Sequence, residues 1–207
     1  ALKKMMFKNG ELYHQTLLNH TPKQKGLLED YSFFIAALLS AYETNYDTKN
    51  LLFAEYLLAH AREKFYKNKI WYLSDDGMNI QADLNDKYYT SAVSQMIENI
   101  IKISAIKASF RYEKFAKESL DTLKAQLNEN ASNVPALAKD YLMSHLGVVV
   151  LKSSKSNLIN NMQAIKHVKY PYLLTKEKEY DEFLACTIRR CFSKDKSIEN
   201  EKMIPMR

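Results

Sequence analysis

The chain is poor in the residues that make tight turns and cross-links. Its 207 residues include four glycines, four prolines and two cysteines. The scarcity of helix-breaking residues favours long helices with few tight turns, and two cysteines are too few for a disulfide-stabilised scaffold. The length suits one large domain or two small ones.

Long apolar runs are also missing. The longest strongly apolar stretch, Phe33–Ala41, is much shorter than the ~18 residues that a membrane-spanning helix needs. Near the start, Lys3 and Lys4 are followed by three apolar residues and then polar ones, which is not the pattern of a signal peptide. We therefore expect a soluble, cytoplasmic protein that does not bind a membrane.

Charged and metal-binding residues are scattered rather than clustered. The net charge is +6, but the lysines and arginines form neither a basic stripe nor a known nucleic-acid-binding module. They are typical of solvated helix faces, and we expect no nucleic-acid partner. The histidines lack the i, i+4 partners of a helical metal site, so we expect no metal and no cofactor; they are His14, His20, His60, His145 and His167.

The first half of the chain is predicted to contain a polar N-terminal segment followed by two helices, one buried and one amphipathic. Residues 1–24 are mixed and polar, with one short strand expected. Residues 26–44 are apolar nearly all round, which indicates an inner helix, with Glu29 and Asp30 in the first turn where the helix dipole favours acids. Asp47 is a good N-cap for an amphipathic outer helix at 49–67, with apolar positions at Leu51, Ala54, Leu58, Ala61 and Phe65.

The same alternation then repeats. An Asp-Gly turn predicts a β-hairpin at 69–83. It precedes a broadly apolar helix at 88–108, an amphipathic helix at 111–127, and a helix starting at Pro135 and ending at His145. Repeated helical hairpins packed side by side explain this pattern. The apolar surface predicted for the 88–108 helix comprises Tyr89, Val93, Met96, Ile97, Ile100, Ile101 and Ile103.

The C-terminal part changes to an α/β pattern. A β-branched run at 147–151, a helix at 156–167 and an apolar run at 171–174 predict a βαβ-like unit. The next segment, 183–188, suits either a third strand or a helix. From Ser193 onward the tail is polar, and we expect it to fray.

Several of these segments together resemble a known family. They include Leu28-Glu29-Asp30-Tyr31, the hairpin segment 71–76, the segment 86–94 and the helix that starts at Pro135. The resemblance ends at Cys186 and Cys191, which match the family's terminal pair of cysteines with four residues between them. The sequence resembles the C-terminal part of the thioredoxin-domain-containing, spermatogenesis-associated proteins, in which a thioredoxin-like domain precedes a six-hairpin toroid similar to N-acylglucosamine 2-epimerases.

The resemblance implies a mainly α protein. Residues 1–145 would form part of an (α/α)6 toroid, with the β-hairpin inserted at 69–83, and residues 146–207 would form a small α/β appendage. Neither a Cys-x-x-Cys motif nor the first half of the toroid is present in this sequence. The chain also departs from the family's usual Pro-Ser-Gly-Asn-Ser motif, since Val93 stands at the asparagine position.

In stacked helical hairpins the first helix of each pair starts at the same end of the stack. The polar residues at these helix starts would therefore lie together on one rim of the toroid, around its mouth. Carboxylates and hydroxyls at such a mouth suit sugar recognition or acid/base chemistry. Capping the helix is the commoner role for residues placed like Glu29 and Asp30, and packing on helix ends is the commoner role for an aromatic residue such as Trp71. The candidate ligand-binding residues are Glu29, Asp30, Tyr31, Trp71, Asp86 and Ser91.

Cys186 and Cys191 are candidate redox residues. Their spacing allows three states: a disulfide, a metal site or two reduced thiols. On a regular helix, residues five apart are poorly aligned for a disulfide. Across a turn they could pair or bind a metal, but no further zinc ligands lie nearby in the sequence. We expect reduced, partly buried thiols.

The resemblance implies the C-terminal portion of a thioredoxin-domain and epimerase-like protein. We expect its rim to bind a small polar or carbohydrate-like ligand when the ring is complete, and the chain not to be catalytically complete on its own. The alternative is a non-catalytic protein-interaction or oligomerisation module. In either case an uncovered inner helix predicts a homo-oligomer or association with an upstream thioredoxin and half-toroid portion.

Overall fold

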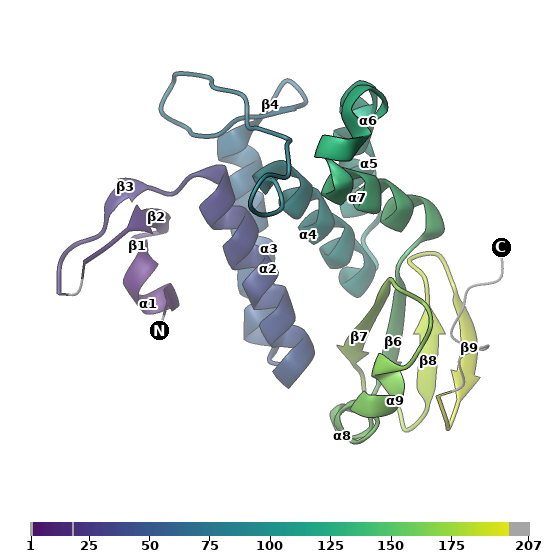
Figure 1. Ribbon diagram of the computed structural model, residues 1–207. Coiled ribbons are helices and arrows are strands. Elements are labelled where there is room, and N and C mark those ends of the chain that lie inside the picture. The colour runs from purple at the N-terminus through teal and green to yellow at the C-terminus, as the bar shows by residue number, and fades with distance from the viewer. Residues whose placement is uncertain (1, 18, 199–207) are drawn as a thin grey trace.

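The computed structural model describes residues 2–17 and 19–198 (Figure 1). The chain begins with α1 (Leu2–Met6) and a three-stranded antiparallel sheet of β1 (Phe7–Lys8), β2 (Glu11–Gln15) and β3 (Lys23–Lys25). The sequence predicted only one strand here. The extra pairing follows from a tight turn at Asn9 and Gly10, whose φ values of 51° and 81° match the turn type that joins hairpin strands.

Helices α2 (Leu28–Asn45) and α3 (Thr48–Phe65) form the first helical pair, close to the predicted ranges. Tyr46 adopts a left-handed conformation between them, and the Asp47 side chain accepts a hydrogen bond of 3.0 Å from the Lys49 amide. The predicted N-cap is therefore confirmed. All five apolar positions predicted for the outer helix are buried: Leu51, Ala54, Leu58, Ala61 and Phe65.

The β-hairpin that follows lies earlier in the chain than predicted. Strands β4 (Tyr66–Lys67) and β5 (Ile70–Trp71) pair across Asn68 and Lys69, which both have positive φ. The predicted hairpin at 69–83 is represented by an isolated bridge between Tyr72 and Gln81 and by neighbouring backbone hydrogen bonds. The prediction took the Asp76-Gly77 pair as the turn of the hairpin. The strands instead pair directly at the end of α3, with Asn68 and Lys69 as the turn.

The second helical pair is α4 (Ala92–Lys107) and α5 (Phe110–Thr122), followed by α6 (Lys124–Asn130), the short 3-10 helix η1 (Ala131–Asn133) and α7 (Pro135–Leu146). The predicted start of α4 at residue 88 was too early, since the Ser91 hydroxyl caps the helix by accepting from the Ser94 amide at 3.2 Å. Tyr89 therefore lies outside the helix and is 60% exposed, whereas the other predicted apolar residues of α4 are buried.

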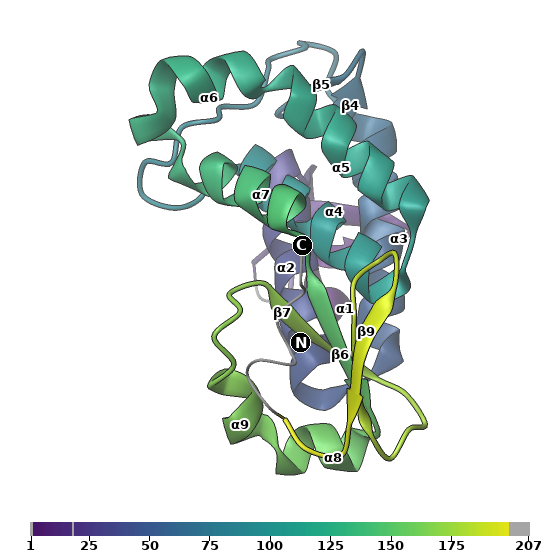
Figure 2. The same cartoon turned by 90° about the vertical axis from the view of Figure 1, so that its right-hand side faces the viewer.

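The helices lie in two rows (Figures 1 and 2). Helices α2, α4 and α7 pack against one another in chain order, while α3 packs against α2, and α5 against α4. The described chain is thus mainly α in its first two thirds. Burial of apolar surface between the rows is the main source of stability for such a layered arrangement.

The C-terminal part is a four-stranded mixed sheet in the order β7-β6-β8-β9. Strand β6 (Val149–Ser153) runs parallel to β7 (Leu173–Glu177), and α8 (Lys155–Asn160) and α9 (Met162–Lys166) connect the two strands. The predicted βαβ unit is therefore confirmed. The single helix predicted within it is divided into two at Asn161. Strand β8 (Phe183–Cys186) settles the open choice at 183–188 in favour of a strand.

The tail was expected to fray from Ser193, but Cys191–Asp195 forms strand β9, antiparallel to β8. The partly buried Phe192 packs against the apolar core of the sheet, which gives this polar segment an anchor. The end of the predicted tail, 199–207, lies outside the described residues.

Strand β6 connects the sheet with the helices. Val150 belongs to the helical core, while Val149 and Leu151 face a second core between the sheet and α8. Both faces of β6 are covered, as is typical of a strand with parallel pairing. Tyr46 adds a further link, since its hydroxyl donates to the Thr175 hydroxyl at 3.0 Å.

Candidate ligand site at the helix N-termini

The first turns of α2, α4 and α7 lie at the same end of the helical rows. The Leu28 amide donates to the Leu73 carbonyl at 3.0 Å, which fixes the start of α2 beside the 72–83 segment. The two carboxylate oxygens of Asp86 accept hydrogen bonds of 2.7 Å from the amides of Ser91 and Ala136, which join the starts of α4 and α7. The structure therefore gathers the sequence candidates of these helix starts at one end.

Asp30 has a capping role in the structure. Its Oδ2 accepts a hydrogen bond of 2.7 Å from the Leu27 amide and lies 2.9 Å from Nδ1 of His14, on β2. The carboxylate thus ties the N-terminal sheet to the first turn of α2. Of the two roles that the sequence left open for Asp30, the helix cap is the one that these contacts support.

Glu29 faces a different environment. Its Oε2 accepts a hydrogen bond of 3.3 Å from the Tyr89 hydroxyl, and the Glu29 charge raises the pKa of that hydroxyl. The Tyr89 ring meets the ring of Phe33 edge to face, with centroids 5.6 Å apart. A carboxylate and two aromatic rings therefore come together beside the exposed side of α2.

These side chains line an open groove of about 530 Å³ along the first turns of α2. Phe33, Phe34 and Ala37 form its apolar floor, and the Glu29–Tyr89 pair stands at its edge. Polar groups at the edge of an apolar concavity are the usual composition of a small-molecule site. This groove is the best-formed candidate site that involves the predicted rim.

Two predicted ligand residues lie in the protein interior instead. Tyr31 is 1% exposed, packs edge to face on Phe65, and has its pKa raised to about 12 by burial. Trp71 is 3% exposed and packs against the rings of Tyr66 and Phe115, with centroids 4.8 and 5.8 Å away. Their rings are covered by core neighbours, so neither side chain faces a ligand in this structure.

Asp86 and Ser91 are also engaged in holding the helix starts. Both oxygens of Asp86 accept backbone hydrogen bonds. Ser91 is 5% exposed, and its hydroxyl donates to the Ser94 hydroxyl at 2.9 Å while accepting from the Ser94 amide. Their contacts are those of positioning residues.

A polar cluster that the sequence analysis did not identify lies between α4 and α7. Glu98 lies 2.8 Å from the Lys102 ammonium and 2.5 Å from that of Lys139. Burial alone would raise the pKa of Glu98, but the two lysines outweigh it and hold the pKa below its usual value. The i, i+4 spacing of Glu98 and Lys102 was the available signal, whereas the contact with Lys139 depends on helix packing.

Asp140 lies next to this cluster and is fully buried. Within the described part of the chain, neither of its carboxylate oxygens has a hydrogen-bond partner. Burial raises its pKa to about 8, and the nearby Glu98 charge adds to the effect. A carboxyl group in this environment is stable in its protonated form.

The cysteine prediction was wrong. Cys186 and Cys191 form a disulfide across the turn that joins β8 and β9, where they are paired positions of the two strands. The expectation of reduced thiols rested on the helical alternative for 183–188. The strand pairing brings the two sulfur atoms together instead.

Comparison of the chain with protein-family models found no match, and neither did comparison with curated proteins. The family resemblance therefore stays a prediction. In residues 2–17 and 19–198, no cluster of three or more His, Cys, Asp or Glu side chains is arranged to hold a metal. No helix in that part of the chain combines the length and apolar character needed to cross a membrane.

Proposed function

We propose that the chain binds a small polar, carbohydrate-like ligand in the groove at the start of α2. The observation that carries the proposal is the Glu29–Tyr89 contact beside the Phe33 ring. A carboxylate accepts hydrogen bonds from sugar hydroxyls, and aromatic rings pack against the apolar faces of sugar rings. The Tyr89 ring is 60% exposed and therefore accessible to such a ligand.

The proposal includes an architecture. The ordered packing of α2, α4 and α7, backed by α3 and α5, supports part of an (α/α)6 toroid in which the helix starts surround the mouth. Because the groove is open on one side, we expect it to bind sugars weakly on its own, with dissociation constants of about 1 mM or above. A further chain segment that closes the ring would strengthen binding by covering the ligand.

Saturation-transfer NMR with glucose, mannose and N-acetylglucosamine tests the proposal. We expect a signal with the unmodified chain that falls about fivefold or more in Glu29→Gln and in Tyr89→Ala, because each variant removes one recognition element. Glu63→Gln is a matched control, since Glu63 is an exposed carboxylate on α3 outside this groove. No signal with any sugar, or equal signals for all variants, would overturn the proposal.

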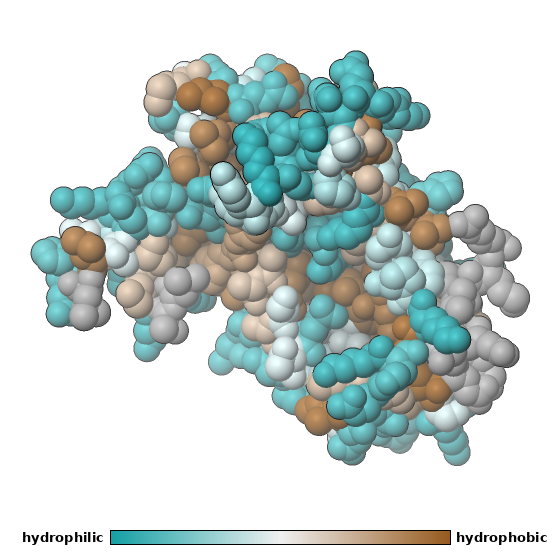
Figure 3. Space-filling model, in the orientation of Figure 1, coloured by the Kyte–Doolittle hydropathy of each residue, from teal (hydrophilic) through white to brown (hydrophobic). Residues whose placement is uncertain are grey.

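One observation favours the alternative of an interaction module. Phe33 is half-buried, while Ala37 and Ser40, one and two turns further along α2, are exposed. Figure 3 shows apolar colours on the surface over part of this region. Such an uncovered stretch on a core helix is typical of a surface that another chain or segment covers.

Light scattering coupled to size exclusion distinguishes the two functions. If α2 is an oligomerisation surface, the measured mass should exceed that of the monomer and fall to it in Ser40→Arg, which adds a charge at an exposed position of α2 outside the groove. A monomer at all concentrations would count against self-association while leaving the sugar titration unaffected.

A further inference from the structure

The disulfide closes a short hairpin tip at the end of the sheet. Cys186 ends β8 and Cys191 begins β9, and the four residues between them form the tip. The Thr187 amide donates to the Arg190 carbonyl at 2.8 Å, which makes the turn tight. The tip is thus held in shape by the disulfide and by backbone hydrogen bonding.

The tip contacts the helical part of the protein through Arg189. Its guanidinium donates to both carboxylate oxygens of Glu113, on α5, at 3.1 and 3.3 Å. It also lies 5.6 Å from the centroid of the Phe110 ring. An exposed ion pair contributes little unless its geometry is held fixed, so this contact depends on the shape of the tip.

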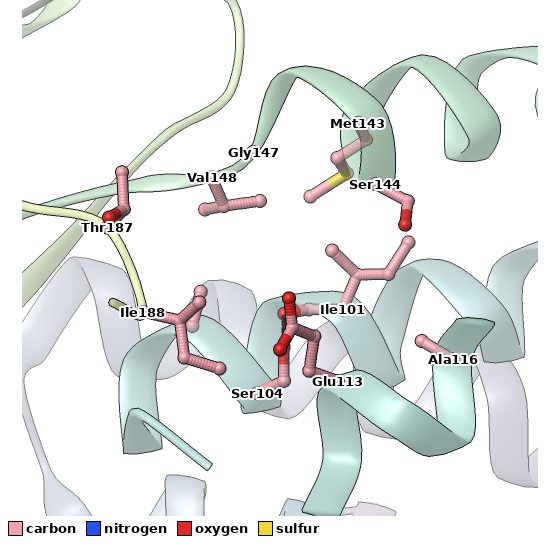
Figure 4. Close-up of a pocket in the computed structure, with 11 residues that line it drawn as sticks. Ile101, Ser104, Glu113, Ala116, Met143, Ser144, Gly147, Val148, Thr187 and Ile188 are labelled. Carbon is pink, nitrogen blue, oxygen red and sulfur yellow. Dashed lines mark hydrogen bonds between the residues drawn. The ribbon is translucent and has the colours of Figure 1, made fainter. Parts of the chain in front are cut away.

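Thr187 and Ile188 also cover a small cavity (Figure 4). Its other walls are formed by side chains of α4, α5 and α7, including Ile101, Glu113 and Met143. The volume of about 50 Å³ leaves room for little more than water. The tip therefore closes a junction between three helices rather than a ligand pocket.

We propose that the Cys186–Cys191 disulfide is a redox switch that controls the docking of this tip on α5. The two cysteines differ in access, since Cys191 is an exposed residue and Cys186 is 1% exposed. Access decides which sulfur a reductant attacks. Reduction therefore begins at Cys191.

The reaction requires a dithiol as reductant. One thiolate of the dithiol attacks the Cys191 sulfur, the disulfide bond breaks, and Cys186 leaves as a thiolate that takes up a proton. The second thiol of the reductant, as its thiolate, then attacks the mixed disulfide, which releases Cys191 as a thiol and leaves the reductant as a cyclic disulfide. Two electrons pass from the dithiol to the protein, and both cysteines end as thiols.

The state of the disulfide should affect how firmly the tip contacts α5. Without the cross-link, only hydrogen bonding holds the tip in shape. Arg189 is then held less firmly in the geometry that lets it reach Glu113 and Phe110, so the first turns of α5 lose part of an outside support.

Hydrogen exchange with mass spectrometry on the full chain tests the switch, with dithiothreitol as the dithiol. We expect two free thiols to appear under native conditions, and amides of residues 110–117 to exchange about fivefold faster while those of 93–101 stay unchanged. Arg189→Gln should reproduce the faster exchange with the disulfide intact. Unchanged far-ultraviolet circular dichroism should show that the fold is retained.

Cys186→Ser combined with Cys191→Ser is the control, and dithiothreitol should not alter its exchange. Three results would overturn the proposal. Thiols that appear only in denaturant would mean a structural disulfide. Reduction without faster exchange at 110–117 would mean that the tip does not depend on it. An equal response of the double serine variant to dithiothreitol would mean that the effect does not pass through the disulfide.

Discussion

Asp86 Oδ2 accepts a hydrogen bond of 2.7 Å from the amide of Ala136, a residue fifty positions further along the chain. The other oxygen of the same carboxylate accepts from the Ser91 amide. A single side chain thus holds the first turns of α4 and α7 together, where free amides and the helix dipole both favour a negative charge.

We predict that Asp86→Ala lowers the free energy of unfolding by roughly 2–4 kcal/mol, because two charge-assisted hydrogen bonds are lost. Urea denaturation measures the change. Asp83→Ala is the matched control, since the exposed Asp83 bonds, among the residues that the structure describes, only to the nearby Asn85 and Lys87, and we expect it to cost less than about 1 kcal/mol. Equal effects of the two substitutions would contradict the bridging role of Asp86.

The burial of Asp140 should make the free energy of unfolding depend on pH. Its pKa is raised by burial from the ordinary 3.8 to about 8, so the folded chain keeps a proton that the unfolded chain releases at lower pH. The stability linked to this proton is complete below about pH 4 and is lost as the pH rises towards 8. Between about pH 5 and pH 8, the unmodified chain should lose roughly 3–4 kcal/mol relative to Asp140→Asn.

Denaturation curves for the unmodified chain and Asp140→Asn across that pH range check this prediction. The difference between them is informative because other titrating groups, including Glu98 and the lysines beside it, are common to both. Curves that stay parallel across the range would mean that Asp140 does not keep its proton in the folded chain.

Asp47 tests the junction between α2 and α3. Replacing it with alanine removes the side-chain acceptor for the Lys49 amide and should cost about 1 kcal/mol in thermal or urea unfolding. Asp47→Asn should restore most of that stability, since asparagine is an equally good N-cap. If both variants lose the same amount, the charge rather than the hydrogen bond would be the important feature.

A substitution at Val93 tests whether this position, where the family that the sequence resembles has asparagine, can hold a polar side chain. The side chain is 1% exposed in the first turn of α4. Introducing the family's asparagine by Val93→Asn would bury an amide in an apolar environment and should destabilise the fold by roughly 2–4 kcal/mol. Val93→Ala, which removes volume without adding polarity, should cost less, and a Val93→Asn variant of unchanged stability would show that the site accommodates a polar group.

The elements that the sequence predicted well depend on local signals. The limits of α3 follow from the Asp47 cap and a regular apolar spacing, and α7 starts at Pro135, as a proline in a first turn favours. The β-branched run of β6 was recognisable because a strand covered on both faces is apolar throughout. Each of these signals lies within a few residues of the element that it defines.

The prediction of the site was less complete because exposure depends on neighbours distant in the sequence. Glu29 lies at the groove, but Tyr31, two residues later, points into the core towards Phe65. Tyr89 was assigned to an apolar helix face, yet the Ser91 cap starts α4 after it and leaves the ring exposed. No local pattern separates these tyrosines.

The sequence by itself determined the order of the main helices, the Asp47 cap and the α/β character of the C-terminal part, because helix propensity, capping and apolar periodicity act over one or two turns. Only the tertiary structure decided the Asp86 bridge, the burial that raises the pKa of Asp140 and the pairing of Cys186 with Cys191. Those features arise from groups brought together by packing, and packing free energy is shared among residues that the sequence keeps far apart.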